Sequence, residues 1–457
     1  MPKYAAPPDI VALLSATELS RPRASELARA FRAAILAGQL SPGTRLPATR
    51  ELAKALGIAR TTVVSVFEQL QAEGYVTSHV GDGTYVTPTL TVNRSDGVAA
   101  TQSSRARRAP SRRGELIAST PLTTAPDTTV RPFRPGIPAL DAFPFEVWSR
   151  LTHRRLRQPP PALLSYADPA GYRPLREALA AYLVAARGVR CTADQVLVVA
   201  GSQQAIDLAA RVLTDPGDAV WVEDPSYVAG RGALIAAGAT LVPVPVDREG
   251  LDVEAGVARN PTARMVYVTP SHQYPLGVTM SVSRRQALLA WAEQADAWVL
   301  EDDYDSEYRY AGPPLGAFQG LDRSERVIYI GTFSKVLFPS LRLGYLVVPP
   351  DLVDVFSRAR AFSDRCAPSL EQAVVADFLA EGHFARHIRR TRALYRARQE
   401  ALVAAVQHRL PGFLMIEPAD AGMHLVAWLP PELDAATVAR RAREVGVELA
   451  PLSAFAL

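Results

Sequence analysis

The stretch that decides the fold of this chain reads Ile328-Tyr-Ile-Gly-Thr-Phe-Ser-Lys335-Val-Leu-Phe-Pro-Ser-Leu-Arg342-Leu-Gly-Tyr-Leu-Val-Val348. Two apolar runs rich in β-branched residues, 327–330 and 343–348, flank a polar loop, and this pattern predicts two buried strands. Lys335 lies in that loop, where loss of hydration would favour its neutral amine, which can form a Schiff base. The nearby hydroxyls and Arg342 could hold a phosphate group. For this stretch alone, a solvated loop lysine is the alternative.

Length and composition indicate a globular protein of two to three domains, with 457 residues of which 48% are hydrophobic and 21% charged. No apolar run approaches the roughly 18 residues of a membrane span, and the first residues lack the apolar core of a signal peptide. Cys191 and Cys366 have no metal-ligand spacing, so we expect reduced thiols in a cytoplasmic protein without a metal site. The net charge of +4 does not by itself indicate a nucleic-acid partner.

The first segment, 19–87, carries three helical patterns followed by two β-prone runs. Apolar residues spaced at helical intervals mark one face of a helix within 23–38, and shorter patterns follow within 48–56 and 60–73. Turn residues around Gly81 join the β-prone runs as a hairpin. Three helices and a hairpin predict a winged helix-turn-helix, and a small helical protein-interaction module is the alternative.

Polar side chains gather on the open face of the third helical pattern, and they are Arg60, Thr61, Thr62 and Ser65. A cation and hydroxyls suit phosphates and base edges in a major groove. The segment resembles the GntR-type DNA-binding domain. It has Gly-x-x-Leu-Pro-x-x-Arg-x-Leu-Ala at 43–53, an Arg-x-Thr-Val helix start and a Gly-Asp-Gly-Thr-Tyr-Val wing, with Ala48 where serine is usual. The DNA-binding residues that this resemblance implies are Arg45, Arg50, Arg60, Thr61, Thr62, His79 and Gly81.

Composition changes abruptly over 88–130, where Ser, Thr, Ala, Pro and Arg dominate and large apolar residues nearly vanish. Such a segment cannot bury a core, so we predict a flexible basic linker. Its arginines could touch DNA phosphates and make the affinity salt-dependent, and a purely solvated linker is the alternative. The arginines are Arg105, Arg107, Arg108, Arg112 and Arg113.

The remaining segment, 131–457, alternates β-prone runs with helical patterns. The runs are 196–200, 219–223, 241–244, 265–269, 298–302, 327–330 and 343–348. Such alternation predicts an α/β fold with a mainly parallel sheet covered by helices on both faces. Ligands of open α/β sheets bind at the loops after the strands, so we look for the site there.

Four of these loops carry candidate groups. Small residues at 200–205 begin a helix and leave backbone N–H groups free for an anion. Tyr227 and Tyr274 follow the second and fourth runs. Asp302 follows the fifth run and could pair with a protonated ring nitrogen, and Tyr304 could bond a phenolic oxygen. Each loop taken singly is more simply a surface loop, but their joint order, ending at a loop lysine, indicates one shared site.

That order resembles the fold-type I pyridoxal-phosphate enzymes over roughly 131–457. The resemblance implies that pyridoxal 5'-phosphate is the cofactor and that Lys335 binds it as a Schiff base. Asp302, two residues before Tyr304, would pair with the pyridine nitrogen in preference to its neighbour Asp303. Tyr304 would bond the ring oxygen and Tyr227 would stack on the ring. The residues implied to hold the phosphate are Ser202, Gln203, Thr332 and Arg342.

The combination of winged helix, linker and aminotransferase-like domain resembles the MocR/GabR-type subfamily of GntR transcription regulators. The motifs that carry this resemblance are His272-Gln-Tyr-Pro-x-Gly, Glu-Asp-Asp-Tyr-Asp-Ser-Glu-Tyr-Arg-Tyr at 301–310 and Gly-Thr-Phe-Ser-Lys335. The resemblance implies a homodimeric regulator that binds double-stranded promoter DNA and senses a small amine, an amino acid or the cofactor. An active pyridoxal-phosphate-dependent aminotransferase with an accessory DNA-binding module is the alternative.

Three departures from the family pattern concern the ligand. The usual Asn-Pro-x-Gly loop reads Tyr274-Pro-Leu-Gly, so the asparagine contact to the ring oxygen is replaced or lost. No arginine directly follows the stacking tyrosine, and Arg231 stands four residues after Tyr227. The chain stops at Leu457, before the final strand and arginine that the family pattern leads us to expect, so its C-terminal end looks incomplete. Because an enzyme needs a clamp that orients its substrate, these departures favour the regulator over the enzyme.

Overall fold

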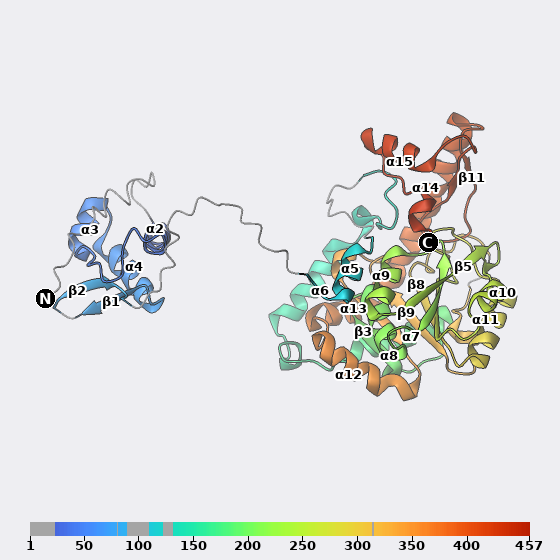
Figure 1. The fold of residues 1–457 in the computed structure, drawn as a ribbon, viewed down its shortest axis with the longest axis horizontal. Coiled ribbons are helices and arrows are strands. Elements are labelled where there is room, and N and C mark those ends of the chain that lie inside the picture. The colour runs from blue at the N-terminus through green and yellow to red at the C-terminus, as the bar shows by residue number, and fades with distance from the viewer. Residues whose placement is uncertain (1–22, 80, 89–108, 122–130, 313–314) are drawn as a thin grey trace. The chain divides into compact units, whose positions relative to one another are not determined.

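The computed structural model describes residues 23–79, 81–88, 109–121, 131–312 and 315–457, which fall into two units, Met1–Ala109 and Pro110–Leu457 (Figure 1). Arg105, Arg107 and Arg108 of the predicted linker lie outside the described residues, as do residues 19–22 of the first predicted domain. None of the described helices is long and apolar enough to cross a membrane.

The N-terminal unit consists of three helices and a β-hairpin. Its elements are α2 (Ala24–Leu36), α3 (Thr49–Leu56), α4 (Arg60–Ala72), β1 (Val76–His79) and β2 (Gly83–Val86). Gly57 ends α3 in the left-handed conformation, with φ 64°, and so allows the tight turn into α4. The two strands pair antiparallel, with His79 opposite Gly83. The predicted winged helix-turn-helix is confirmed.

One apolar core holds these elements together. Phe31 on α2 and Phe67 on α4 meet edge to face, with 5.7 Å between their ring centroids. Val63, Leu70 and Val86 are fully buried beside them. Because each such side chain stabilises the fold by roughly 1.5–3 kcal/mol, the packing fixes α4 with its polar face outward.

An eight-stranded sheet forms the centre of the second unit, in the order β3-β10-β9-β8-β7-β4-β5-β6. Its strands are β3 (Val196–Val199), β4 (Ala219–Asp224), β5 (Thr240–Asp247), β6 (Gly250–Leu251), β7 (Met265–Val268), β8 (Trp298–Asp303), β9 (Val327–Thr332) and β10 (Gly344–Val347). Strands β9, β8, β7, β4 and β5 run parallel, whereas β10 is antiparallel to both β3 and β9. The seven predicted runs all belong to this sheet, and the predicted α/β fold is confirmed.

Helices cover both faces of the sheet (Figure 1). One face packs against α8 (Ser202–Leu213), α9 (Val228–Ala237) and α12 (Val353–Asp364). The other face packs against α7 (Arg173–Arg187), α11 (Val282–Gln294) and α13 (Ser369–Ala380), and the unit also contains α6 (Phe145–Arg157) and α10 (Val253–Arg259). Successive side chains of β4 serve opposite faces, since Val222 packs with the first group whereas Trp221 stacks on Trp291 of α11 at 3.7 Å between centroids.

The last part of the chain contains α14 (His383–Arg409), β11 (Met415–Ile416), β12 (Ala427–Trp428) and α15 (Ala435–Glu444). Hydrogen bonds join the segment between β11 and β12 to the loop after β8. The Tyr310 hydroxyl donates to the Gly422 carbonyl at 2.6 Å, and the Gly422 N–H donates to the Tyr308 carbonyl at 2.7 Å. These bonds hold residues 422–424 near the carboxyl end of β8.

A short helix, α5 (Arg112–Ser119), lies within the segment predicted to be a flexible linker. Ser111 caps its start by accepting a hydrogen bond from the Gly114 N–H at 3.1 Å. The helix packs beside α9, where a Cβ added to Gly232 would lie 3.6 Å from Thr120 Cγ2. Residues from Pro110 onward therefore group with the large unit, and this part of the predicted linker is ordered because it docks on α9.

Candidate functional site

The candidate site lies at one edge of the large sheet. Gly344 at the start of β10 pairs with Val199 at the end of β3 and with Thr332 at the end of β9. Strand β8 is the other neighbour of β9. Because the parallel strands end at the same edge, the loops that carry Lys335 and Asp302 come together there.

Lys335 follows β9 and turns its amine toward a backbone carbonyl. Its Nζ donates a hydrogen bond to the Gly136 carbonyl at 2.7 Å. Burial lowers the pKa of Lys335, and the nearby Asp305 and Asp302 carboxylates oppose that lowering. Gly136 has φ 81°, and an added Cβ would lie 2.8 Å from the lysine Nζ, so glycine leaves the space that the amine occupies. The site thus favours a neutral, nucleophilic amine.

Asp302 is the last residue but one of β8, and its carboxyl group faces the same site. Oδ2 accepts a hydrogen bond from the Tyr267 hydroxyl at 2.8 Å. Oδ1 is buried and has no hydrogen-bond partner among the described residues. Burial raises the pKa of Asp302 to about 7, against the lowering effect of the Tyr267 hydrogen bond. A buried carboxylate with one free oxygen fits a cationic N–H group of a ligand.

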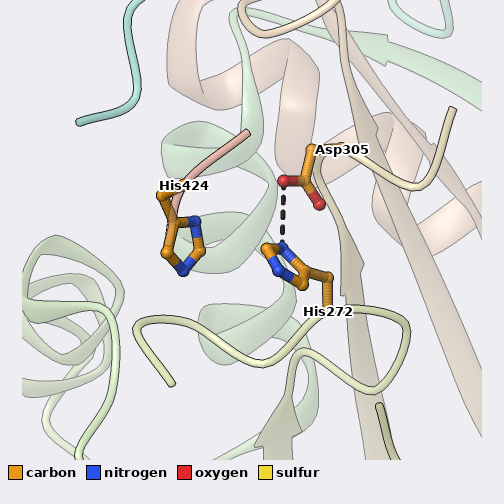
Figure 2. A group of neighbouring side chains, drawn as sticks. All are labelled: His272, Asp305 and His424. Atoms are coloured by element: carbon orange, nitrogen blue, oxygen red, sulfur yellow. Dashed lines mark hydrogen bonds and ion pairs between the residues drawn. The ribbon is translucent and has the colours of Figure 1, made fainter. Parts of the chain in front are cut away.

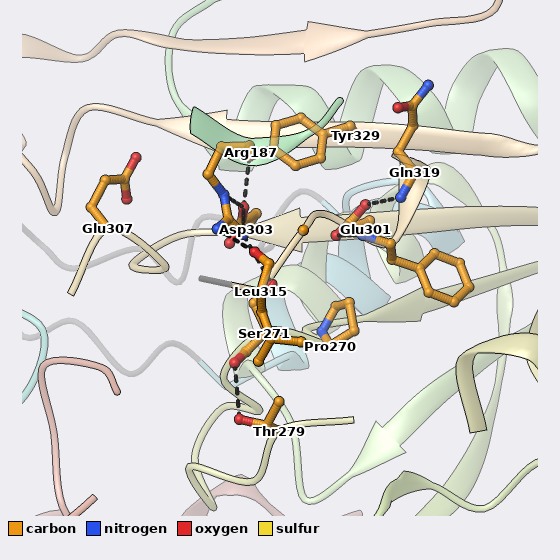
Figure 3. A network of polar contacts seen from close by, with 12 residues as sticks. Arg187, Pro270, Ser271, Thr279, Glu301, Asp303, Glu307, Leu315, Gln319 and Tyr329 are labelled. Carbon is orange, nitrogen blue, oxygen red and sulfur yellow. Dashed lines mark hydrogen bonds and ion pairs between the residues drawn. The ribbon is translucent and has the colours of Figure 1, made fainter. Parts of the chain in front are cut away.

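Asp303 is the next residue of the strand, so its side chain points to the opposite face, where it meets Arg187 and Tyr329 (Figure 3). Its Oδ2 accepts hydrogen bonds from the Arg187 guanidinium at 2.8 Å and from the Tyr329 hydroxyl at 2.7 Å. Behind it, Glu301 accepts from two backbone N–H groups, and burial raises the pKa of Glu301 to about 7. Asp303 Oδ1 also lacks a partner among the described residues, but the ion pair and hydrogen bonds of Asp303 are internal to the fold. Asp302 instead lies near enough to Lys335 for their charges to interact, so the geometry favours Asp302 as the ligand-facing carboxyl group.

The loops after β3 and before β10 form a cradle for an anion. Ser202 and Gln203 open α8 behind Gly201, which has φ 94°. The Arg342 guanidinium donates to the Ala200 carbonyl at 2.8 Å and lies over Gly201, where an added Cβ would be 3.6 Å from its Nη1. A helix N-terminus beside a guanidinium is a typical binding site for a phosphate group.

Thr332 and Gln203 have partners of their own within this cradle. The Ser334 N–H donates to Thr332 Oγ1 at 3.1 Å. Gln203 Nε2 donates to the Ala229 carbonyl at 2.7 Å, and its Oε1 is buried without a partner among the described residues. Thr332 therefore still has its hydroxyl proton to offer, whereas Gln203 holds the start of α9.

Three tyrosines line the site from the loops that follow β4, β7 and β8. The Tyr274 ring meets those of Tyr227 and Tyr304 nearly at right angles, with centroids 5.9 Å and 6.0 Å away. The Tyr304 hydroxyl donates to the His272 carbonyl at 2.9 Å. The sequence predicted that this hydroxyl bonds the ring oxygen of the cofactor. To do so, it would have to turn away from the His272 carbonyl. Together these rings give the site an aromatic wall.

A polar cluster of His272, Asp305 and His424 adjoins the tyrosines (Figure 2). His272 Nδ1 lies 3.1 Å from Asp305 Oδ2, which also accepts from the Met423 N–H at 3.0 Å. The two imidazole centroids are 4.6 Å apart, and the nitrogen and oxygen atoms that could bind a metal lie within 4.8 Å of one another. Burial lowers the pKa of His424 to about 4.

Arg231, which the sequence left without an assigned role, is engaged by the chain itself. Its Nη1 donates to the Phe455 carbonyl at 2.7 Å, and the Ser226 N–H donates to the same carbonyl at 3.0 Å. The Phe455 ring meets Tyr274 edge to face at 5.4 Å between centroids. One N–H group of the Arg231 guanidinium is therefore already bonded to a backbone carbonyl, next to the three tyrosines.

The predicted DNA-binding residues lie on the N-terminal unit. Arg50, Arg60 and Thr61 are exposed and Thr62 is half-buried, on α3 and the start of α4. Arg60 Nε donates to Thr49 Oγ1 at 3.4 Å, which links the two helices. His79 and Gly81 are exposed at the hairpin turn. A helix face with a cation and hydroxyls next to an exposed hairpin has the form of a major-groove reader with a wing.

Arg45 has a position that the sequence did not indicate. Its guanidinium donates to the Asp82 carbonyl in the hairpin turn and lies 6.0 Å from the centroid of the Tyr85 ring. An added Cβ on Gly83 would be 3.0 Å from Arg45 Nε. Arg45 therefore holds the hairpin turn in addition to any phosphate contact that its exposed side chain makes.

Sequence reasoning missed four residues of the large site, Gly136, Tyr267, Asp305 and His424. Tyr267 could have been found, because it lies opposite Leu300 on the neighbouring strand and so shares a face with Asp302. Gly136 and His424 are brought in from distant loops that have no periodic signal.

Two family models match the chain. The model for bacterial regulatory proteins of the gntR family matches residues 23–86, within the N-terminal unit. The model for aminotransferases of class I and II matches residues 141–457, within the large unit.

Curated relatives share both parts of the chain. The probable rhizopine catabolism regulatory protein MocR of Rhizobium meliloti is 46% identical over 435 residues, covering 94% of this chain and 87% of the relative. The pyridoxine biosynthesis transcriptional regulator PdxR of Corynebacterium glutamicum is 31% identical over 423 residues, covering 92% of this chain and 87% of the relative. Both similarities extend across the reader and the aminotransferase-like parts.

Solved structures resemble the large unit. The α-aminoadipate aminotransferase LysN of Thermus thermophilus, complexed with N-(5'-phosphopyridoxyl)-L-leucine, has 32% sequence identity and a TM-score of 0.66, covering 72% of this chain and 84% of that one. The kynurenine aminotransferase of Pyrococcus horikoshii has 30% identity and a TM-score of 0.66, covering 78% and 88%.

Proposed function

Because the chain belongs to the MocR-type subfamily of the GntR transcription regulators, we propose that it binds pyridoxal 5'-phosphate through Lys335 and senses a small amine, an amino acid or the cofactor itself. The observation that carries this proposal is the meeting of a lysine whose pKa burial lowers with a buried carboxyl oxygen that lacks a partner. A regulator must respond to a ligand, and these groups provide the chemistry to bind one.

The residues present fit the proposed cofactor. Asp302 Oδ1 is free to accept from a protonated pyridine nitrogen, and Arg342 with the start of α8 can hold a phosphate. Tyr227 offers a ring face, and Tyr304 offers a hydroxyl near the ring oxygen. When bound, the cofactor supplies an aldehyde that condenses with amines. Lys335 would hold that aldehyde, and an incoming amine would compete with the lysine for it.

Promoter recognition is assigned to the N-terminal unit. Arg60, Thr61 and Thr62 would enter the major groove, and Arg45, Arg50, His79 and Gly81 would contact the backbone or the adjacent minor groove. Their exposure on one small unit supports this role. Half-site spacing would then match the separation of two recognition helices in a homodimer.

The homodimer is part of the proposal. The large unit exposes Phe362 and Tyr166, whose relative exposures are 90% and 82%. They are candidates for a surface that a second copy covers, because a contiguous exposed apolar patch marks a protein–protein contact. A ligand can regulate only if it binds one arrangement of the two reader domains better than another.

An active aminotransferase is the second candidate, because relatives of the large unit include enzymes such as the aromatic-amino-acid aminotransferase 1 of Thermococcus litoralis, 32% identical over 327 residues. The engagement of Arg231 by the Phe455 carbonyl weighs against it, since that arginine is the first to follow the tyrosine Tyr227.

Titration of the purified protein with pyridoxal 5'-phosphate tests the proposal. We expect a bound-cofactor absorbance band that saturates, and an affinity for a promoter fragment that changes when the band forms. A protein that binds the promoter identically with and without cofactor and amines would contradict a sensing role.

A further inference from the structure

The cluster of His272, Asp305 and His424 lies within reach of the proposed cofactor lysine, yet the proposed cofactor contacts do not use it. Asp305 is the first of the charges that oppose the lowering of the Lys335 pKa. The His424 ring lies 5.3 Å from the Tyr274 ring, centroid to centroid, and His272 contacts the Tyr304 hydroxyl at 3.1 Å. The cluster is therefore placed where an amine bound next to Lys335 would extend.

The hydrogen-bond partners of the two imidazoles define their tautomers. His424 Nε2 lies 3.0 Å from the Pro275 carbonyl, which can only accept, so this nitrogen carries the proton. His424 Nδ1 then has a free lone pair, and no described residue donates to it. By the same reasoning His272 Nδ1 donates to the Asp305 carboxylate, which leaves the buried His272 Nε2 as an acceptor without a partner.

The cluster thus presents acceptors and no free donor. Two neighbouring backbone groups hold its members in place. The Met423 N–H donates to Asp305, and Gly422 lies against the His272 ring, where an added Cβ would be 1.8 Å from Cε1. His424 is half-buried and remains within reach of a ligand, whereas His272 is buried. Asp305 is also buried, so His424 is the group that a ligand can meet, with Asp305 and His272 packed behind it.

We propose that His424, backed by the buried Asp305 carboxylate, forms a subsite for hydrogen-bond donors, so that the effector is an amine that carries hydroxyl groups and not a carboxylate. The proposal rests on the proposed function, because the amine would be held next to Lys335. A ligand hydroxyl would donate to His424 Nδ1, which has a lone pair and no proton. A carboxylate there would face a second carboxylate, while Arg231 already donates to the Phe455 carbonyl.

Sites that hydrogen-bond a ligand hydroxyl discriminate strongly against ligands that lack it, because the buried groups are then left without partners. The effect should appear in a matched set of amines of similar size. We choose 2-amino-1,3-propanediol, which has two hydroxyls, serine, in which a carboxylate replaces one hydroxymethyl group, and 2-aminopropane, which has neither.

The test titrates the full chain, loaded with pyridoxal 5'-phosphate, with each amine and follows both the cofactor absorbance and the affinity for a promoter fragment. We expect the diol to act at a concentration at least tenfold lower than 2-aminopropane and lower than serine. His424→Phe should remove this preference, and His424→Gln, which keeps an acceptor, should retain part of it. His408→Phe, an exposed histidine on α14, is the control and should leave the preference unchanged.

Three outcomes would overturn the proposal. Serine could act at the lowest concentration, all three amines could act equally, or the preference could survive in His424→Phe. A fourth arm adds zinc or a chelator, because two histidines and a carboxylate also suit a transition metal. If zinc bound at the cluster and the chelator removed the preference, the subsite would be a metal site instead. Failure of the cofactor to bind would refute the proposed function itself, which is a separate result.

Discussion

The reader unit and the large unit place their functional side chains in opposite environments. Arg50, Arg60 and Thr61 are exposed on helices that follow one another in sequence. Lys335 and Asp302 meet at a sheet edge. Burial there lowers the pKa of Lys335 and raises the pKa of Asp302, so both neutral forms are favoured. The proposed DNA contacts therefore depend on solvated charges, whereas the proposed ligand site depends on groups that the fold keeps from being charged.

Replacing Lys335 with alanine should give the largest effect. The variant removes the amine that would hold the cofactor, so we expect complete loss of the covalent adduct that borohydride reduces. Absorbance and intact mass after reduction measure it. Lys54→Ala, an exposed lysine of α3, is the matched control and should keep the adduct. An adduct that persists in Lys335→Ala would refute the assignment of the lysine.

The neighbours Asp302 and Asp303 should differ in what they support. Asp303→Asn breaks the buried ion pair with Arg187, and such a loss costs about 3–5 kcal/mol of unfolding free energy. Asp302→Asn should instead weaken cofactor binding at least tenfold and leave the fold intact. Urea unfolding and cofactor titration of both variants separate the two roles. If Asp303→Asn lost the cofactor without losing stability, the two aspartates would have to exchange roles.

The raised pKa of Asp302 also predicts a pH dependence of stability. Between the ordinary aspartate pKa and about 7, the folded protein keeps a proton that the unfolded chain loses. The stability from this group is therefore fully present at low pH and is lost as pH rises through 7. Between pH 4.5 and 8, cofactor-free wild type should lose about 2–3 kcal/mol relative to Asp302→Asn. Urea unfolding at both pH values checks this, and a constant difference would contradict the buried carboxyl group.

A variant of Arg60 tests the proposed role of the exposed side chains of the reader unit. Arg60→Ala should weaken promoter binding by about 1–3 kcal/mol if the side chain reads a base edge. If it meets only phosphate, the loss should be uniform across sequences with a shallower salt slope. Titrations of promoter and unrelated DNA distinguish the two cases, with Arg29→Ala on α2 as the control. No loss on any DNA would remove Arg60 from the interface.

Loss of the contact between α5 and α9 should give the smallest effect, a change in the ligand response of promoter affinity. Gly232→Leu would push against Thr120 and release α5, whereas Gly232→Ala adds a Cβ at an ordinary 3.6 Å contact. We expect Gly232→Leu to change the ligand response of promoter affinity about twofold to fivefold, a coupling change of roughly 0.4–1 kcal/mol, with cofactor binding unchanged. An unchanged response would mean that the docked helix does not transmit the signal.

The alternation of runs and helical patterns made the large fold predictable from sequence. The strand from Val327 to Thr332 and the strand from Gly344 to Val347 are continuous apolar runs, because helices cover both faces of the sheet. Because both strands could be predicted, the position of Lys335 in the loop between them could be predicted as well. The reader unit was predictable because its apolar faces recur at helical spacing and Gly57 separates two of its helices.

The remaining features depend on tertiary contacts that no local pattern records. Gly136 and His424 meet at the site although they lie near opposite ends of the sequence of the large unit. Helix α5 lies in a segment of linker composition and is held by its contact with α9. Arg45 carries a charge that suits phosphate, yet only the structure reveals that it also holds the hairpin turn.

Promoter affinity and amino transfer, measured in one preparation, test the central claim most directly. The account predicts that pyridoxal 5'-phosphate or an amine changes the affinity or bending of a promoter with repeated half-sites, while transfer of the amino group to a 2-oxo acid stays slow. Efficient turnover, together with a promoter affinity that ignores cofactor and amine, would contradict the regulator and establish an enzyme.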